Sequence, residues 1–155
     1  MIQSDIPSFW ENNLGQSGET LTVKTSGKGF YQVTDSVAGW LNSIRANNGL
    51  LVVFICHTSA SLIIQENADP DVVRDLEDTL DILAPRNRNY LHSCEGPDDM
   101  PAHIRSMLTS TSLSIPVQNK RMVLGTWQGI FLAEHRDQPH IRRIALHFNG
   151  NQFDG

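Results

Sequence analysis

The sequence is poor in cysteine, in positive charge and in long apolar runs, and each shortage excludes a class of protein. Two cysteines among 155 residues are far fewer than the disulfide frameworks of small secreted domains contain. Cys56 and Cys94 are therefore predicted to be reduced thiols rather than a bridge. The formal net charge is −5, and the 12 lysine and arginine residues are scattered, which argues against nucleic acid or an anionic membrane as a partner.

No stretch of the sequence is long and apolar enough to cross a membrane. A spanning helix needs about 20 consecutive apolar residues, and no segment approaches that length. The first residues, MIQSDIPSFWENN, have neither the basic start nor the apolar stretch of a secretory signal. We therefore expect a cytoplasmic protein, and 155 residues are most simply a single folded domain.

The chain divides into a short arm and one domain. Residues 1–20 are rich in glycine, asparagine and serine and show no sustained period, so they are predicted to form a loosely attached N-terminal arm. The domain is expected to span residues 21–155. Within it, alternating or apolar segments predict strands at 21–26, 29–34, 50–56, 61–65, 112–117, 121–125, 129–135 and 141–148. The first two are predicted to form a hairpin across Gly27 and Lys28, and the next two to pair through the turn at 57–60.

Three helices are predicted from apolar positions spaced three and four residues apart. The first is expected to begin at the N-cap Asp35 and to end at the Asn-Gly pair 48–49. The second is expected to run from the Asp-Pro pair 69–70 to Pro85, because aspartate can accept hydrogen bonds from free amides and proline needs no amide partner there. A short third helix opens at Pro101. Eight strands and three helices in uneven order predict an α+β fold, a single compact domain of mixed, largely antiparallel β-sheets.

Three histidines lie beside turns or strand ends: His57 after the strand at 50–56, His92 in a polar segment, and His103 in the third helix. Imidazole is the commonest side-chain ligand of zinc, and three protein ligands with an open position are typical of catalytic sites. The residues alone leave two interpretations open. In the first, these three side chains hold a divalent metal ion, with zinc as the preferred metal. The alternative is three ordinary hydrogen-bonded histidines, since no HExxH or HxH motif brings two of them onto one face. The other three are placed outside the metal site: His135, His140 and His147.

Polar side chains also gather after the strand at 61–65. Asp69 is explained as a helix cap, whereas Glu66 and Asn67 have no such explanation. A carboxylate near an imidazole cluster can act as a general base, a metal ligand or an orienting group, and the alternative is an ordinary solvated loop. Glycines flank a second polar segment, GTWQG at 125–129, which presents Gln128 to a ligand or simply covers the end of a sheet.

Five segments in series resemble the YjbQ family of small bacterial and archaeal proteins. They are HTSASL (57–62), ENADPD (66–71), EGPDDMPAHI (95–104), SLSIPV (112–117) and LGTWQGIFLAEHR (124–136). The resemblance covers roughly residues 20 to 150, and the order and spacing of the segments make it more specific than any one of them.

The resemblance implies a compact α+β fold, a homotrimer with pockets near the subunit boundaries, and a metal ion held by histidines. It also implies a weak thiamine-phosphate synthase activity, a transferase reaction that joins a pyrimidine methyl diphosphate to a thiazole phosphate and releases diphosphate. Carried over by motif, the metal ligands are His57, His92 and His103. His57 is also carried over as a catalytic residue, and its catalytic neighbours are Glu66, Asn67, Thr126 and Gln128.

The chain departs from the family pattern at one position that bears on the metal. Some relatives have a second histidine two positions before the one that matches His103, and this chain has Pro101 there. His92 therefore becomes the more important third ligand. Diphosphate chemistry usually calls for magnesium on carboxylates or for arginine clamps, so magnesium is the alternative metal. Arg105, Arg136 and Arg142 are the candidate clamps.

Two other functions remain open at the level of sequence. The first is metal-assisted hydrolysis of a small phosphorylated or acyl molecule in the same pocket, with a metal-bound water as the nucleophile. The second is a non-catalytic trimeric ligand-binding protein, in which the polar segments serve only subunit contacts, because unpaired buried polar atoms cost about 1–3 kcal/mol each.

Overall fold

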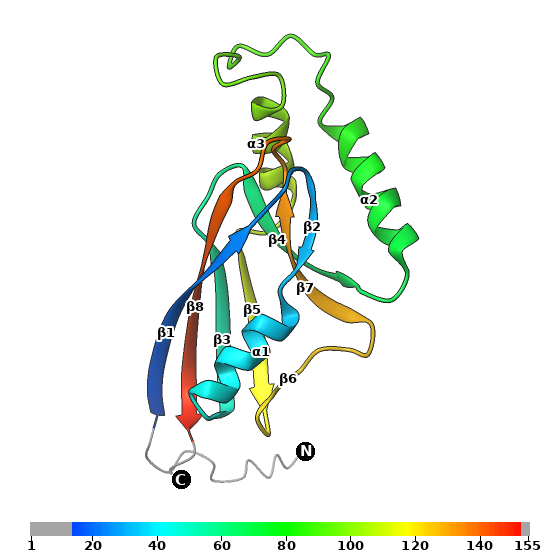
Figure 1. Ribbon diagram of the computed structural model, residues 1–155. Coiled ribbons are helices and arrows are strands. Elements are labelled where there is room, and N and C mark those ends of the chain that lie inside the picture. Colours follow the sequence, from blue (N-terminus) through cyan, green and yellow to red (C-terminus); the bar gives the residue numbers. More distant parts are fainter. Residues whose placement is uncertain (1–13, 153–155) are drawn as a thin grey trace, which may run out of the picture.

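The computed structural model describes residues 14–152, which form eight strands and three helices (Figure 1). In chain order these are β1 (Leu14–Lys24), β2 (Gly29–Gln32), α1 (Thr34–Ser43), β3 (Ala46–Ile55), β4 (Ala60–Glu66), α2 (Pro70–Leu83), α3 (Asp99–Leu108), β5 (Ser112–Gln118), β6 (Arg121–Met122), β7 (Gln128–Glu134) and β8 (Ile141–Gln152). None of the helices in this part of the chain has the length and apolar character that a membrane span requires.

The strands form two antiparallel sheets. The five-stranded sheet has the order β1-β8-β3-β5-β6 and the three-stranded sheet the order β2-β7-β4. The main core contains side chains from both sheets and from α1; its larger members are Val37, Leu41, Leu51, Ile55, Leu62, Ile115, Ile130, Leu132, Ile144 and Phe148. The predicted α+β class with largely antiparallel sheets is confirmed.

Two predicted strand pairings are wrong. β1 pairs with β8 and β2 pairs with β7, so the two segments expected to form a hairpin belong to different sheets. Gly27, in the connection between them, has a φ of 137°, and a Cβ there would meet the Asp137 carbonyl oxygen at 2.6 Å. Likewise, β3 pairs with β5 and β8 while β4 pairs with β7. Each short connection therefore crosses from one sheet to the other.

Several predicted boundaries also move. Residues 14–20, expected in the N-terminal arm, belong to β1, and the rest of that arm lies outside the described residues. α1 is capped at Val33, so Asp35 lies inside its first turn. The helix ends at Ser43, not at 48–49, because Arg45 takes a φ of 55° and β3 begins immediately after it.

The predicted helix at 70–83 is confirmed as α2. Asp69 is its N-cap, with Oδ1 accepting a hydrogen bond from the Asp71 amide at 2.9 Å, and Pro70 opens the first turn. None of its residues is fully buried, and Figure 1 shows the helix standing beside the sheets. It is attached through Asp81, which pairs with Lys28 at 2.8 Å and with Arg105.

α3 lies at the end of the three-stranded sheet. Ser106 Oγ donates to the Ala60 carbonyl at 3.0 Å, and the backbones of Leu62 and Ser110 exchange hydrogen bonds of 2.7 and 3.2 Å. The helix begins at Asp99 rather than at Pro101, which lies in its first turn. These contacts pack the C-terminal half of α3 against β4, and the candidate site is found toward the N-terminal end of the helix.

Replacing Asp69 with alanine is expected to lower the free energy of unfolding by about 1 kcal/mol, because the Asp71 amide loses its acceptor. Asp69→Asn keeps a side-chain oxygen at the cap and is expected to remain close to wild type. Denaturant unfolding followed by circular dichroism measures both variants. Equal stability of Asp69→Ala and the wild type would contradict the role of this cap.

Candidate functional site

Two of the three predicted metal ligands meet at the N-terminus of α3, together with a carboxylate. His92 Nε2 lies 2.7 Å and His103 Nε2 lies 3.3 Å from the same oxygen, Asp99 Oδ2. Asp99 and His103 are four residues apart on α3 and so share one face of the helix. Ligand atoms of the three residues all lie within 4.8 Å of one another, and no other group of three such side chains in residues 14–152 is this close.

The hydrogen bonds of His103 show which of its ring nitrogens is available. Nδ1 lies 3.0 Å from the Thr58 carbonyl oxygen; because a carbonyl only accepts, Nδ1 carries the proton. In the neutral ring, Nε2 then carries a lone pair, and this atom faces the Asp99 Oδ2 oxygen 3.3 Å away. Two electron-rich atoms at this distance require a proton on Nε2 or a cation between them. A histidine that donates its other N–H to a backbone carbonyl is also the usual arrangement of a metal ligand.

Asp99 is held in place from behind by an arginine. The carboxylate is 1% exposed, and its other oxygen, Oδ1, accepts from Arg136 Nη1. Arg136 Nε also donates to Asp98 Oδ2 at 2.9 Å. Burial alone would raise the pKa of Asp98, but hydrogen bonds from the Asp137 amide and from Arg136 outweigh it and lower the pKa below its usual range. One guanidinium therefore holds the carboxylates of both Asp98 and Asp99 in place.

The group fits a divalent metal ion. Two imidazoles and one carboxylate are donors that suit zinc, manganese or iron, and three protein ligands leave coordination positions for water or substrate. Magnesium prefers an all-oxygen shell, and this group offers one carboxylate. Asp99 takes the place that sequence analysis gave to His57.

A cavity of about 560 Å³ opens beside His92. Its size lies within the range of small-molecule sites. Two guanidinium groups and several neutral donors line it, and no carboxylate does among the described residues. The lining consists of Arg86, Arg88, Asn89, Tyr90, His92, Ser93, Gly96, Pro97 and Met100. Arg88 also lies over the Tyr90 ring, 5.8 Å from its centroid, so cationic and aromatic groups face the same space.

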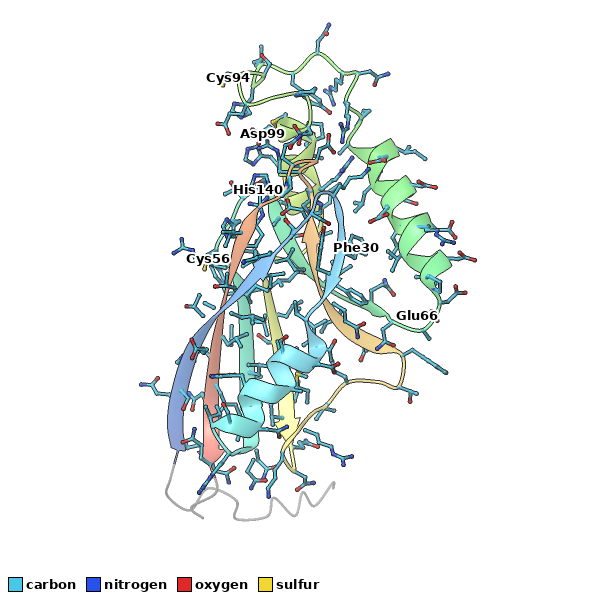
Figure 2. The ribbon with its side chains drawn as sticks, in the orientation of Figure 1. Phe30, Cys56, Glu66, Cys94, Asp99 and His140 are labelled. Carbon is cyan, nitrogen blue, oxygen red and sulfur yellow. The ribbon has the colours of Figure 1, made fainter. Side chains whose placement is uncertain are left out.

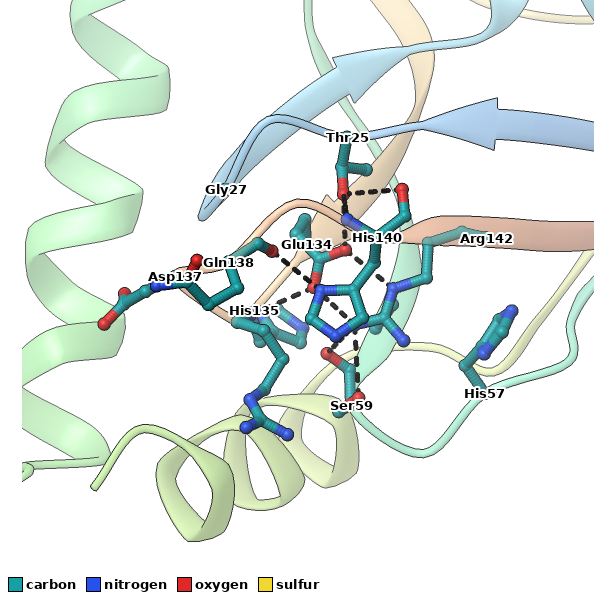
Figure 3. A network of polar contacts seen from close by, with 12 residues as sticks. Thr25, Gly27, His57, Ser59, Glu134, His135, Asp137, Gln138, His140 and Arg142 are labelled. Carbon is teal, nitrogen blue, oxygen red and sulfur yellow. Dashed lines mark hydrogen bonds and ion pairs between the residues drawn. The ribbon is translucent and has the colours of Figure 1, made fainter. Parts of the chain in front are cut away.

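A buried ion pair joins the two sheets close to this group (Figure 3). Arg142 of β8 donates to Glu134 of β7 through Nε at 2.6 Å and Nη2 at 2.5 Å. Thr25 Oγ1 adds a bond of 2.9 Å to the same carboxylate. Burial alone would raise the pKa of Glu134, but the hydrogen bonds from Arg142, the Arg136 amide and Thr25 lower it overall.

His135, placed outside the metal site by sequence analysis, is buried next to this pair. Its Nε2 lies 2.8 Å from Ser61 Oγ, and Ser61 is 0% exposed. Burial, with a further contribution from Arg105, lowers the pKa of His135 to about 4. The ring is therefore neutral at pH 7 and serves as a packed, hydrogen-bonded core group.

The structure does not bring His57 into the group with His92 and His103. Its Nε2 accepts a hydrogen bond from the Arg143 amide at 2.9 Å, so that nitrogen is already used. Burial, followed by the nearby charges of Arg142 and Arg143, lowers the pKa of His57. His57 is linked to the metal-ligand group only through the next residue of the chain, because the carbonyl oxygen of Thr58 accepts a hydrogen bond from His103.

The predicted catalytic residues form a second group at the other end of the three-stranded sheet. Glu66 and Gln128 are paired in register, the Asn67 amide donates to the Trp127 carbonyl at 3.0 Å, and Thr126 lies in the same loop. Ala60 is the first residue of β4 and Glu66 is the last. Six steps of about 3.3 Å per residue place them roughly 20 Å apart. Figure 2 shows Asp99 near the top of the molecule and Glu66 well below it.

Sequence analysis missed Asp99 and Arg136 as partners of the histidines. Asp99 lies in the segment EGPDDMPAHI, where only His103 was given a role, and Arg136 was considered only as a clamp for diphosphate. The spacing of Asp99 and His103, four residues apart next to Pro101, is the local signal that could have predicted a shared helix face. Both cysteines are free, as predicted, and both are exposed.

Comparisons with known proteins agree on one family. The family described as UPF0047 protein YjbQ-like matches residues 19–151. The UPF0047 protein sll1880 of Synechocystis sp. is 51% identical over 136 residues, which cover 87% of this chain and 92% of that protein. The UPF0047 protein YjbQ of Escherichia coli O157:H7 is 46% identical over 133 residues, covering 85% and 96%.

Solved structures share the fold. A hypothetical protein from Aeropyrum pernix K1 superposes with a TM-score of 0.80 at 32% identity, covering 87% of this chain and 99% of that one. A YjbQ/UPF0047 family protein from Clostridium acetobutylicum superposes with a TM-score of 0.78 at 37% identity, covering 84% and 98%.

The buried neutral ring of His135 predicts a specific loss of stability in acid. Between its ordinary pKa of 6.5 and the folded value of about 4, the unfolded chain binds a proton at this ring and the folded chain does not. The free energy of unfolding therefore falls as the pH falls through this interval, by roughly 3 kcal/mol from this group, and the contribution levels off below it.

Urea unfolding at several pH values measures this effect. The variant His135→Gln, which can still bond Ser61, is expected to lose less stability than the wild type between pH 6.5 and 4. His147→Gln makes the same change at an exposed position of β8 and is expected to keep the wild-type slope. If His135→Gln also keeps that slope, His135 is not the source of the acid sensitivity.

Proposed function

This chain belongs to the YjbQ-like UPF0047 family, and from that premise we propose that it is a metal-dependent enzyme acting on small phosphorylated molecules. The observation that carries the proposal is the convergence of His92 Nε2, His103 Nε2 and Asp99 Oδ2 within 4.8 Å. The Nδ1 bond from His103 to Thr58 supports it, because it leaves the Nε2 lone pair aimed at the shared position.

Each residue of the site has a distinct part in this proposal. His92, His103 and Asp99 would hold the ion, zinc in first place because of the two imidazoles. A bound divalent ion would neutralise charge on a phosphate or diphosphate and activate a bound water. Arg136 acts as a positioning residue, because it fixes the orientation of the Asp99 carboxylate. At the neighbouring cavity, Arg88 attracts an anionic substrate toward His92, whereas the charge of Arg86 is already paired with Asp137.

The first candidate reaction is the thiamine-phosphate synthase type of transfer that the family resemblance implies. In it, the bond between the methylene carbon of the pyrimidine and the diphosphate oxygen breaks, and the diphosphate leaves with the bonding electrons. The thiazole nitrogen forms the new bond to that carbon. The site would assist by stabilising charge on the departing diphosphate, which is the kind of electrostatic assistance that arginines and metal ions provide.

The second candidate reaction is metal-assisted hydrolysis of a small phosphorylated or acyl substrate. The three-ligand group favours it, because open coordination positions next to a cavity of about 560 Å³ admit water as well as substrate. Incubation with both phosphorylated substrates separates the two candidates. Diphosphate released together with the coupled product indicates the transferase, and inorganic phosphate released without coupling indicates the hydrolase.

The proposal includes a homotrimer, because the site of a single chain lacks Glu66 and its neighbours. These residues lie roughly 20 Å along β4 from the entry that contacts α3. We propose that a neighbouring copy brings Glu66, Asn67, Thr126 and Gln128 to the cavity beside His92. Glu66 would then act as a general base or orient the substrate.

Purified protein is expected to bind one zinc ion per chain, measured by calorimetry and by elemental analysis. His103→Asn removes one ligand and is expected to weaken zinc binding by at least about tenfold, and Arg136→Gln, which frees the Asp99 carboxylate, by about 10–100-fold. His147→Gln serves as the matched control at an exposed histidine. Equal zinc affinity in His103→Asn and the control would remove the ligand assignment.

The shared site is tested by mixing two inactive variants. Glu66→Gln and His103→Asn are each expected to lose the coupling activity when assembled alone. When the two chains are co-expressed, about a quarter of the sites in randomly mixed trimers combine both intact residues, so that part of the activity returns.

Glu66→Gln mixed with Asn67→Ala is the control, because both changes fall in the same group and no chain has both residues intact. This mixture is expected to stay inactive. If the Glu66→Gln and His103→Asn mixture is equally inactive while mixed trimers are found by native mass spectrometry, the site is not shared between copies.

A further inference from the structure

A second cluster of donors lies on the other side of the Thr58 carbonyl, around the turn at 57–59 and the start of β8. Figure 3 shows His140, Arg142 and His57 side by side above Ser59. The positive charges of Arg142 and Arg143 act on His57, and the carboxylate that opposes them, Glu134, is 1% exposed. Toward solvent, the cluster therefore presents mainly cationic and N–H groups.

His57 has a free donor in this cluster. Because the Arg143 amide donates to Nε2 at 2.9 Å, the neutral ring must carry its proton on Nδ1. Nδ1 has no hydrogen-bond partner among residues 14–152. The backbone of β8 thus fixes both the orientation of the ring and the nitrogen that can donate.

Arg142 has a second free donor. The side chain is 4% exposed, and its Nε and Nη2 are used by Glu134. Nη2 also lies 3.2 Å from Ser59 Oγ. Nη1 makes no hydrogen bond in the described part of the chain, although it is not a fully buried atom. An almost fully buried guanidinium, held rigidly by an ion pair, therefore keeps one nitrogen for a ligand.

We infer that His57, Ser59 and Arg142 form an oxyanion site that binds a phosphate group, with the positive charge of Arg143 close to His57. Phosphate is favoured because it can accept several hydrogen bonds at once, and the free donors here come from the His57 imidazole and the rigid Arg142 guanidinium, with the charge of Arg143 nearby. His140 borders the site; its Nδ1 is occupied by the Gln138 carbonyl at 2.7 Å.

The site deepens the proposed function and rests on it for its biological role. His103 contacts the turn through Thr58, whereas His92 lines the cavity with Arg86 and Arg88. The metal-ligand group therefore connects two separate anion-attracting regions. A transferase that joins two phosphorylated substrates needs two such regions, and a simple hydrolase needs one.

Phosphate binding is tested by titrating inorganic phosphate and inorganic diphosphate into the protein in the presence of a chelator. Histidine ring signals in ¹⁵N-labelled protein report the site directly, and the His57 Nδ1–H signal is expected to shift on saturation. Arg143→Gln is expected to weaken phosphate binding by about tenfold, because one of the positive charges next to His57 is lost. Tighter binding of diphosphate assigns the site to the leaving group, and tighter binding of phosphate assigns it to the acceptor substrate.

Arg121→Gln is the matched control, since it removes the same charge from an exposed position of β6. β6 pairs with Val117 and Gln118 at the end of β5, whereas Phe54 pairs with Ser112 at its start. Arg121 therefore lies at the opposite end of β5 from the residue that pairs with Phe54. The control is expected to bind phosphate like the wild type. An equal loss in both variants, or His57 signals that do not move, would overturn the site. Neither result depends on zinc binding or turnover, so the proposed function would stand or fall separately.

Discussion

The ion pair between Glu134 and Arg142 fixes the relation between the two sheets. Glu134 ends β7 in the three-stranded sheet, and Arg142 begins β8 in the five-stranded sheet. Thr25 at the end of β1 and Ser59 before β4 bond to the same pair. Removing one member of such a buried pair typically costs about 3–5 kcal/mol, because the other charge is left without compensation. The turn that leads into β4 is therefore tied to this buried pair through Ser59.

The turn at residues 57–59 determines where the metal-ligand group can form. The Thr58 carbonyl orients His103, while Arg136, two residues after Glu134, orients Asp99 from behind. Glu134 and Arg142 lie on either side of the loop between β7 and β8. Together they organise neighbouring sites whose residues are far apart in the chain. A rigid support of this kind is what a metal or phosphate site needs for its ligands to stay in place.

The parts of the structure that depend on local chemistry could be predicted, and those that depend on distant contacts could not. α2 was predicted because the cap at Asp69 and the proline after it act within one turn. The sheet partners of β1 and β2 could not be, because alternation shows which side chains are buried but not which strand lies beside them. Two of the three histidines grouped in the sequence, His92 and His103, lie together in the structure. Asp99 was missed because its burial depends on Arg136, which follows 37 residues later, and Glu66 lies at the far end of its strand.

The attachment of α2 has a consequence for the behaviour of the molecule in solution. The helix has no fully buried residue and is held to the body by charge pairs at Asp81. Beneath it, a space of about 10 Å³, close to the room that one water molecule needs, lies against Arg105, whose Nε has no partner among the described residues. Added salt screens the partly exposed Lys28–Asp81 pair more than it weakens apolar burial, whereas Arg105 of the second pair is buried. Ionic strength therefore acts on this helix selectively, and its amides exchange with solvent before those of the sheets.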